Sequence, residues 1–239
     1  MLRFVSDLHL CAETPALLAA FEKLLEVHAA DDELYILGDL LDAWPGDDEQ
    51  DDWALTLRRA LRAASKKGPI RLLHGNRDFM LGARFAEDSG IEVLTADHVE
   101  INLGDERAVL LHGDTLCTDD EAYQQQRPHL RDRNWQSELL SRSLGERRAL
   151  AKALRGSSEA HKANLPSAIM DANVDAIEAL FRACGARVMI HGHTHRPGIH
   201  DHAGGRRYVL GDWRRCGWLL TYDGHEFRLG CIPLPSEPH

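Results

Sequence analysis

The sequence contains few cysteines, and their spacing indicates no function. Five cysteines lie at positions 11, 117, 184, 216 and 231 and include no C-x-x-C pair. An odd number of widely spaced cysteines indicates neither a disulfide framework nor a thiolate zinc site. We therefore expect free thiols in a reducing compartment.

Long apolar runs are also missing. No stretch approaches the roughly 20 apolar residues that a membrane-spanning helix needs. The first ten residues, MLRFVSDLHL, have the pattern of a strand and lack the features of a secretory leader. Together these absences predict a cytoplasmic location.

Positive charge is scarce: the chain has 28 Lys and Arg against 38 Asp and Glu, which gives a net charge of −10. This balance argues against a nucleic-acid partner. The charge is unevenly spread: residues 127–162 carry +5 and the rest of the chain −15. The basic segment is either a solvated surface or a contact for anionic lipid headgroups, and the sequence leaves both open.

A chain of 239 residues is long enough for one large domain with an insertion. Strand-like runs at 2–6, 34–38 and 70–74 alternate with helical patterns that begin at Thr14-Pro15, span 51–65 and end near Gly90. Further strands are expected at 91–94, 98–103 and 107–112. This alternation predicts a layered α/β fold.

The pattern changes in the middle of the chain. Two basic amphipathic helices are predicted at 129–144 and 146–155, with breaks at Gly145 and Gly156. A helix over 168–184 and strands at 186–193, 207–212, 217–223 and 225–230 follow. We predict a core of residues 1–122 and 166–239 and an inserted helical cap of residues 123–165.

Polar side chains follow five of the strand-like runs. They are Asp7, His9, Asp39, Asn76, His112, His193 and His195. In open α/β sheets, ligand sites gather at the carboxyl ends of strands. The i, i+2 spacing in H-G-H-T-H places His193 and His195 on one side of an extended chain. We therefore expect the seven donors in one place.

Two carboxylates, one amide and four imidazoles, without a thiolate, suit two borderline divalent ions such as Mn²⁺, Fe²⁺ or Zn²⁺. With Asp39 bridging, each ion would have four protein ligands. A pair of ions about 3.5–4 Å apart is used for in-line displacement at phosphorus. The set thus predicts a cationic site for a phosphate ester.

The order D-x-H, G-D-x-x-D, G-N-x-D, H-G-D and G-H-x-H resembles the calcineurin-like metallophosphoesterases. The resemblance implies a four-layer α/β/β/α sandwich with an inserted helical cap. It also implies one ion held by Asp7, His9, Asp39 and His195, and a second held by Asp39, Asn76, His112 and His193.

Stretches between these motifs, among them LYILGDLLDAWPGDD, HGNRDFMLGARFA and LLHGDTLCTDDEAY, are similar to the UDP-2,3-diacylglucosamine pyrophosphatases of lipid A biosynthesis. That family resemblance implies two Mn²⁺ ions and attack of metal-activated water on the α-phosphorus of a lipid-linked UDP-sugar. The products would be UMP and 2,3-diacylglucosamine 1-phosphate. A monomer, peripheral on the cytoplasmic face of the inner membrane, is the expected form.

The same resemblance implies roles for individual residues. The implied catalytic residues are Asp39, Asn76, Arg77 and His112. The implied substrate contacts are Asn76, Arg77, Asp120, Ser158, Lys162 and His193. Asp78 and Asp114 are expected to orient histidines or amides around the ions.

Arg77 departs from the pattern of the wider superfamily, in which a histidine often follows Gly-Asn. Arginine cannot act as an acid near neutral pH. A phosphate monoester, with a second pKa near 6, leaves without being protonated. A guanidinium that stabilises charge is therefore sufficient for a diphosphate substrate, and Arg77 favours a pyrophosphatase.

Three questions stay open at this level. Leucines of the cap line either an acyl-chain cleft or the core of a helical hairpin, and they are Leu139, Leu140, Leu144, Leu150 and Leu154. A dimetal phosphoesterase for another nucleotide diphosphate or phosphodiester is the alternative enzyme, and a non-catalytic scaffold is the alternative outside catalysis. His74, His191 and His200 are interpreted as structural or solvent-exposed histidines, and Asp42, Asp47 and Asp48 as solvated loop residues.

Overall fold

The computed structural model describes residues 1–164 and 169–234, with residues 157–164 described by their backbone only. Its first sheet has the strand order β11-β10-β1-β2-β3-β4. Strands β1 to β4 pair in parallel, and β10 joins β1 antiparallel. The strands are β1 (Leu2–Val5), β2 (Glu33–Leu37), β3 (Ile70–Leu73), β4 (Glu92–Leu94), β10 (Gly217–Tyr222) and β11 (Phe227–Ile232).

The second sheet has the order β5-β6-β7-β9-β8. Strands β6, β7 and β9 are parallel, and antiparallel strands flank them at both edges. The strands are β5 (His98–Leu103), β6 (Glu106–Leu111), β7 (Val188–His191), β8 (Gly198–Asp201) and β9 (Arg206–Val209). Strand β8 was not predicted from the sequence.

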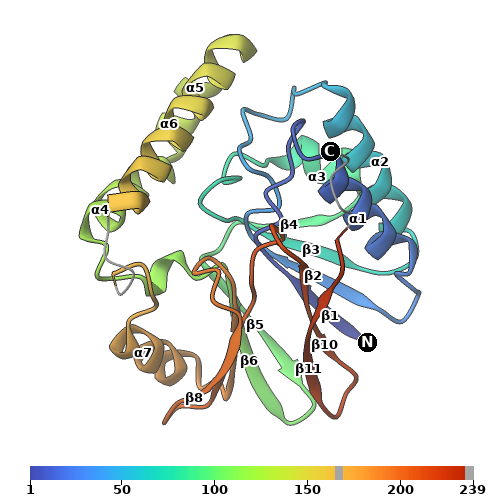
Figure 1. The fold of residues 1–239 in the computed structure, drawn as a ribbon, viewed down its shortest axis with the longest axis vertical. Helices are drawn as coiled ribbons and strands as arrows, with labels where there is room; N and C mark the ends of the chain where they lie inside the picture. The colour runs from blue at the N-terminus through green and yellow to red at the C-terminus, as the bar shows by residue number, and fades with distance from the viewer. Residues whose placement is uncertain (165–168, 235–239) are drawn as a thin grey trace.

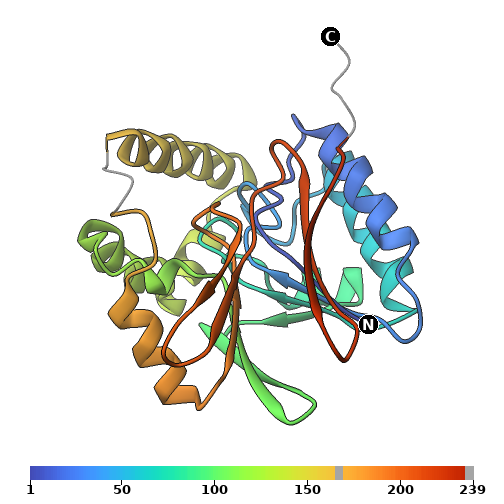
Figure 2. The same cartoon turned by 60° about the horizontal axis from the view of Figure 1, so that its bottom comes forward.

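Helices cover the outer faces of the two sheets. Helices α1 (Pro15–Glu26), α2 (Asp52–Ser65) and α3 (Ala83–Ser89) lie beside the first sheet, and α7 (Val174–Cys184) lies beside the second (Figures 1 and 2). Helix α7 begins six residues later than predicted, after Asn173, whose side chain accepts hydrogen bonds from Asp175 N and Ala176 N. The predicted four-layer α/β/β/α sandwich is confirmed.

Side chains along each strand point alternately to its two faces, and together they fill the three spaces between the four layers. In β1, Val5 packs among the helices on the outer face, whereas Phe4 packs between the two sheets. In β6, Leu110 lies between the sheets and Val109 faces α7. Successive residues of a strand point to opposite faces, so each strand contributes to two apolar layers.

The segment between β6 and α7, within the second half of the sandwich, forms three α-helices, which are α4 (Glu121–Leu130), α5 (Arg133–Leu140) and α6 (Leu144–Asn164). They project away from the other helices in both views (Figures 1 and 2). The predicted break at Gly156 is wrong, because α6 runs through it. The break predicted at Gly145 lies slightly earlier, at residues 141–143 between α5 and α6. A Cβ atom at either glycine would meet nothing within 4 Å, so neither marks a tight turn.

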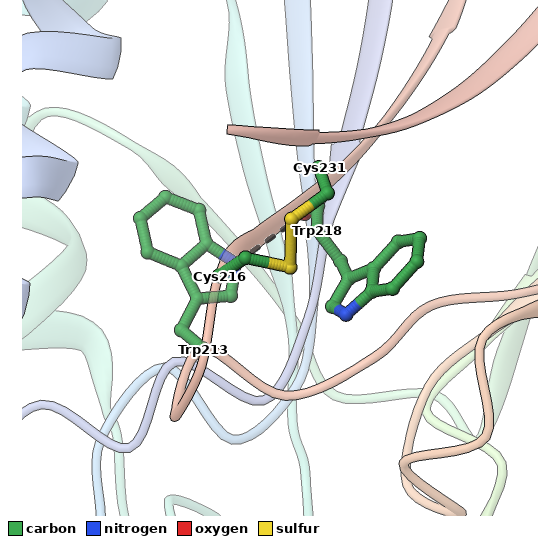
Figure 3. The surroundings of a disulfide bond; sticks show 4 residues. All are labelled: Trp213, Cys216, Trp218 and Cys231. Atoms are coloured by element: carbon green, nitrogen blue, oxygen red, sulfur yellow. Dashed lines mark hydrogen bonds between the residues drawn. A yellow bond between two sulfur atoms is a disulfide. The ribbon is translucent and has the colours of Figure 1, made fainter. Parts of the chain in front are cut away.

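The prediction of five free thiols is also wrong. Strands β10 and β11 pair so that Trp218 lies opposite Cys231, and this register brings Cys216 next to Cys231 with a Cα–Cα distance of 5.7 Å. The two cysteines form a disulfide (Figure 3). Cys11, Cys117 and Cys184 remain thiols. The pairing depends on hairpin register, which the spacing of two cysteines 15 residues apart does not reveal.

Candidate active site

The seven predicted donors reach one end of the sandwich from the carboxyl ends of five strands. Asp7 and His9 follow β1, Asp39 follows β2 and Asn76 follows β3. From the second sheet, His112 follows β6, while His193 and His195 follow β7. The structure brings all seven together, as the contacts below show.

The backbone of this site adopts conformations that side chains normally avoid. Among the described residues, the non-glycine positions with positive φ are Asp7, His9, Asp39, His193 and His195, with values from 50° to 64°. Each such residue costs of order 1–3 kcal/mol, and such residues concentrate at functional sites. All five belong to the predicted donor set, so the strain is confined to it.

Glycines next to the donors allow the strand ends to approach the carboxylates. A Cβ atom at Gly192 would lie 2.1 Å from Asp7 Oδ2, and one at Gly75 would lie 2.0 Å from Asp39 Oδ1. Gly38, with φ of +85°, leaves room for the His112 ring. The glycines of the motifs H-G-H, H-G-N and G-D are therefore required by close approach.

One half of the cluster is built around Asp7. His195 Nε2 lies 3.2 Å from Asp7 Oδ1 and 3.5 Å from His9 Nε2. His9 Nδ1 is buried without a hydrogen-bond partner in the described part of the chain, 4.0 Å from Asp39 Oδ2. Asp7 Oδ2 accepts a hydrogen bond from His193 N at 2.8 Å, which links this half to the other.

The other half is built around Asn76 Oδ1. It lies 3.0 Å from His112 Nε2 and 2.9 Å from His193 Nδ1. Asp39 Oδ1 lies 3.7 Å from His112 Nε2 and accepts a hydrogen bond from Arg77 N at 2.8 Å. Asp39 thus faces both halves, as a bridging group would.

Burial and charge act against each other in this cluster. Burial would raise the pKa of Asp7, but the hydrogen bond with His195 and the charges of His195, His112 and His9 lower it well below its usual range. For His112, burial lowers the pKa, and the carboxylates of Asp39, Asp7 and Asp114 more than reverse the effect. Asp7 is therefore held ionised among imidazoles.

Asp78 and Asp114 lie behind the donors, where they orient backbone and side chains. Asp78 is fully buried and accepts hydrogen bonds from Gly75 N and Leu40 N, each at 2.8 Å. Burial and the charge of Asp39 raise the pKa of Asp78 to about 7. Asp114 accepts from Tyr123 Oη at 2.5 Å and from Arg127 Nε at 2.7 Å.

Comparison with known proteins decides the family. A family model described as calcineurin-like phosphoesterase matches residues 2–197. The chain belongs to the calcineurin-like phosphoesterase family. A solved structure of a hypothetical protein from Pyrococcus horikoshii OT3 matches this phosphoesterase in fold alone, with a TM-score of 0.51 and 11% identity over 99% of this chain and 90% of that chain.

Curated relatives extend over nearly the whole phosphoesterase. A UDP-2,3-diacylglucosamine hydrolase from Sodalis glossinidius (strain morsitans) is 44% identical over 235 residues, covering 95% of this chain and 98% of that protein. Another of the same name from Pseudomonas savastanoi pv. phaseolicola is 42% identical over 244 residues, covering 99% and 98%.

The donors of this phosphoesterase fit divalent cations. The sets Asp7–His9–His195 and Asp7–Asp39–His112 each offer three ligand atoms within 4.8 Å of one another. Asp7 and Asp39 are at most 2% exposed, so their charges need compensation inside the protein. Oxygen and imidazole donors without thiolate suit borderline divalent metals.

A cavity of about 260 Å³ begins at these donors and ends under the projecting helices. Its polar end is lined by Asn76, Arg77, Asp120, Tyr123 and His193. Apolar residues make up most of the remaining lining, among them Phe79, Leu130, Trp135, Leu139, Leu150 and Leu154, and Asp42, Gln126, Arg147 and Arg155 also line it. Leu140 and Leu144 are not among its lining residues, and Leu140 is 47% exposed.

The remaining predicted substrate residues differ in what the structure shows. Arg77 Nε is buried without a hydrogen-bond partner among the described residues. Asp120 caps α4, because its side chain accepts a hydrogen bond from Tyr123 N at 3.1 Å. Ser158 and Lys162 lie within α6, and their side chains are outside the described part of the chain.

The interpretation of Asp42 and Asp47 as solvated residues is wrong, whereas Asp48 is exposed. Asp47 accepts hydrogen bonds from Trp44 Nε1 at 2.9 Å and from Gly82 N at 3.1 Å. Asp48 pairs with Arg147, and the buried Asp42 pairs with Arg155, both on α6. Charges within a loop cannot be assigned partners until a distant helix is placed against it.

Asp212, a carboxylate near the histidines, was not singled out from the sequence. Its Oδ2 lies 3.4 Å from His195 Nδ1, and Oδ1 of Asp42, which was interpreted as solvated, lies 4.0 Å from His9 Nδ1. Asp212 did carry a signal, because it ends an apolar run in Leu-Gly-Asp as Asp39 does.

Proposed function

We propose that this phosphoesterase hydrolyses the pyrophosphate bond of UDP-2,3-diacylglucosamine, giving UMP and 2,3-diacylglucosamine 1-phosphate. The observation that carries the proposal is one cavity that is lined by the donors Asn76 and His193 and, elsewhere, mostly by apolar side chains, which form an apolar chamber. A substrate with a diphosphate at one end and acyl chains at the other matches that division. The names of the curated relatives support the same substrate.

Two Mn²⁺ ions are proposed as the cofactors, the first held by Asp7, His9, Asp39 and His195 and the second by Asp39, Asn76, His112 and His193. Such ions supply water activation and charge neutralisation at phosphorus. The protein orients the donors: Leu37 O lies 2.9 Å from His112 Nδ1, which keeps the lone pair of His112 Nε2 toward Asn76 and Asp39.

Arg77 and His193 are proposed to bind the diphosphate itself. Arg77 lines the polar end of the cavity, where its guanidinium can pair with phosphate oxygens through planar, directional bonds. Because the leaving group is a phosphate, the charge that develops there needs stabilisation rather than a proton. We place Asp120, Ser158 and Lys162 on the nucleotide or glucosamine part of the substrate.

The apolar chamber is proposed to hold acyl chains. Leu139 of α5 and Leu150 and Leu154 of α6 line it, together with Phe79 of the core. Leu139 and Leu150 also pack against the main apolar cluster, so the cap leucines serve as core and lining together. The two readings of these leucines are therefore compatible.

A peripheral position on the cytoplasmic face of the inner membrane and a monomeric state complete the proposal. The described helices include none that is long and apolar enough to cross a bilayer. Support for the membrane surface comes from exposed Leu140, Arg133 and Lys152 on the projecting helices. Exposed apolar and cationic side chains are the two kinds that interfacial helices use to contact anionic headgroups.

The test compares the lipid nucleotide with UDP-glucose, which shares the diphosphate and lacks the acyl chains. Leu154→Gln should raise KM for UDP-2,3-diacylglucosamine in detergent micelles about tenfold, because a polar amide is then buried in the chamber. Leu144→Gln, on the same helix but outside the cavity lining, is the matched control and should behave as wild type. Equal turnover of UDP-glucose and the lipid by wild type would favour the alternative, a phosphoesterase for another nucleotide diphosphate or phosphodiester. Activity on neither would favour a scaffold.

A further inference from the structure

The sequence motif Tyr-x-Leu-Gly-Asp occurs twice, at residues 35–39 and 208–212. The first copy ends β2 of one sheet and places Asp39 in the donor cluster. The second copy ends β9 of the other sheet, which pairs in parallel with β7, the strand that leads to His193 and His195. In each sheet this motif thus brings an aspartate to the same end of the sandwich.

We propose that Asp212 is a positioning residue that orients His195 for metal binding. Its Oδ2 lies 3.4 Å from His195 Nδ1, whereas the opposite ring nitrogen, Nε2, lies 3.2 Å from Asp7 Oδ1. A carboxylate beside Nδ1 favours the tautomer with the proton on that nitrogen, so the lone pair of Nε2 faces the cluster. This inference rests on the proposed function.

The segment that carries Asp212 is anchored on both sides. Leu210 N donates to His191 O at 2.7 Å, and Trp213 N donates to Asp7 O at 3.2 Å. The fully buried Trp213 also donates from Nε1 to Trp218 O at 3.3 Å, beside the Cys216–Cys231 disulfide (Figure 3). Asp212 therefore has a fixed backbone position between two residues that are tied to the site.

The surroundings of Asp212 explain how it acts without being a ligand. A separation of 3.4 Å exceeds that of a usual N–H···O bond, so its influence on His195 is mainly electrostatic. Arg214 Nε lies 3.2 Å from the same Oδ2, but its side chain is 70% exposed, so solvent weakens that competing pair. His112 has the corresponding support from Leu37 O at 2.9 Å.

The test is calorimetric titration of metal-free protein with Mn²⁺. Asp212→Asn preserves shape and removes the charge, and it should weaken Mn²⁺ binding about 10- to 100-fold, the usual effect of losing such an outer partner. Asp212→Glu should restore part of the affinity. Asp201→Asn, the same substitution at an exposed ion pair with Arg206, should bind Mn²⁺ as wild type does.

Thermal unfolding of the metal-free proteins separates positioning from a structural role. The inference predicts the same Tm for metal-free Asp212→Asn and wild type. Unchanged Mn²⁺ affinity in Asp212→Asn, or a lowered metal-free Tm that accounts for the weaker binding, would overturn it. Wild-type protein that binds no Mn²⁺ would contradict the proposed metal function and this inference together.

Discussion

The geometry of the site depends mainly on single residues at the strand ends. Positive φ at Asp7, Asp39 and His195, among others, turns side chains inward at a cost in backbone energy. The sequence motifs predicted which donors converge, because their positions after strands are visible in the chain. They did not reveal the strain, which exists only when strands of both sheets end at one place.

Gly192→Ala tests the requirement for close approach. The added Cβ would lie 2.1 Å from both Asp7 Oδ2 and Ser6 Oγ, so the loop must shift at a cost of about 1–3 kcal/mol in the free energy of unfolding. We expect a lower Tm and weaker Mn²⁺ binding. Gly145→Ala, where a Cβ meets nothing within 4 Å, should leave binding intact. Wild-type Mn²⁺ affinity in Gly192→Ala would contradict the account.

Arg77 determines which leaving group the site can stabilise. Its guanidinium suits a phosphate leaving group, which needs charge stabilisation, rather than an alkoxide, which needs a proton. Arg77→Ala should lower kcat by about 10²-fold or more, as expected when one stabilising donor is lost from a reacting centre. Arg77→Lys should recover only part of the activity, because the planar guanidinium is gone. Steady-state kinetics on the lipid nucleotide provide the measurement. A change in KM alone would show that Arg77 binds substrate without stabilising the transition state.

At the scale of elements, α6 is held to the core by arginines. Arg147 Nη1 donates to Pro45 O at 2.7 Å and pairs with Asp48, while Arg148 Nε donates to Glu49 Oε2 at 2.8 Å. Part of the basic excess of the cap therefore neutralises acidic groups of the loop before α2. Sequence analysis detected the uneven charge but left its use open, because the partners lie about 100 residues apart.

The lowered pKa of Glu49 predicts how the attachment of α6 to the core depends on pH. Burial would raise its pKa, but Arg148 and the amides of Asp51 and Gln50 bind the carboxylate and lower the pKa below its ordinary value of 4.5. The stabilisation is therefore present above about pH 4.5 and is lost as pH falls through the lowered pKa. The Tm difference between wild type and Glu49→Gln should shrink between pH 6 and pH 3. A constant difference would contradict this role of Glu49.

Helix boundaries in the cap were the least predictable elements. Glycine lowers helix propensity by about 1 kcal/mol, which made Gly145 and Gly156 plausible ends. Packing of Leu150 against the core cluster and the bonds of Arg147 and Arg148 instead hold α6 over 21 residues. The division of the chain into a core of residues 1–122 and 166–239 and a cap of residues 123–165 stays a prediction.

For the whole molecule, periodic strands and helices were sufficient to predict a layered α/β fold, and the resemblance to calcineurin-like metallophosphoesterases implied its four-layer form. The disulfide, strand β8 and the pairing between loop acids and α6 were not predictable, because each depends on contacts between segments whose relative position the sequence does not encode locally. The division of one cavity into a polar and an apolar part likewise appears only when the projecting helices are placed beside the strand ends.

The most direct test of the account is UMP release from UDP-2,3-diacylglucosamine in ¹⁸O-labelled water, with metal-free protein before and after addition of Mn²⁺ and with Asp39→Ala as control. We predict that UMP forms only in the wild-type protein with Mn²⁺ and that the label enters UMP, as water attack on the α-phosphorus requires. Release without metal, undiminished release by Asp39→Ala, or label in the lipid phosphate would contradict the account.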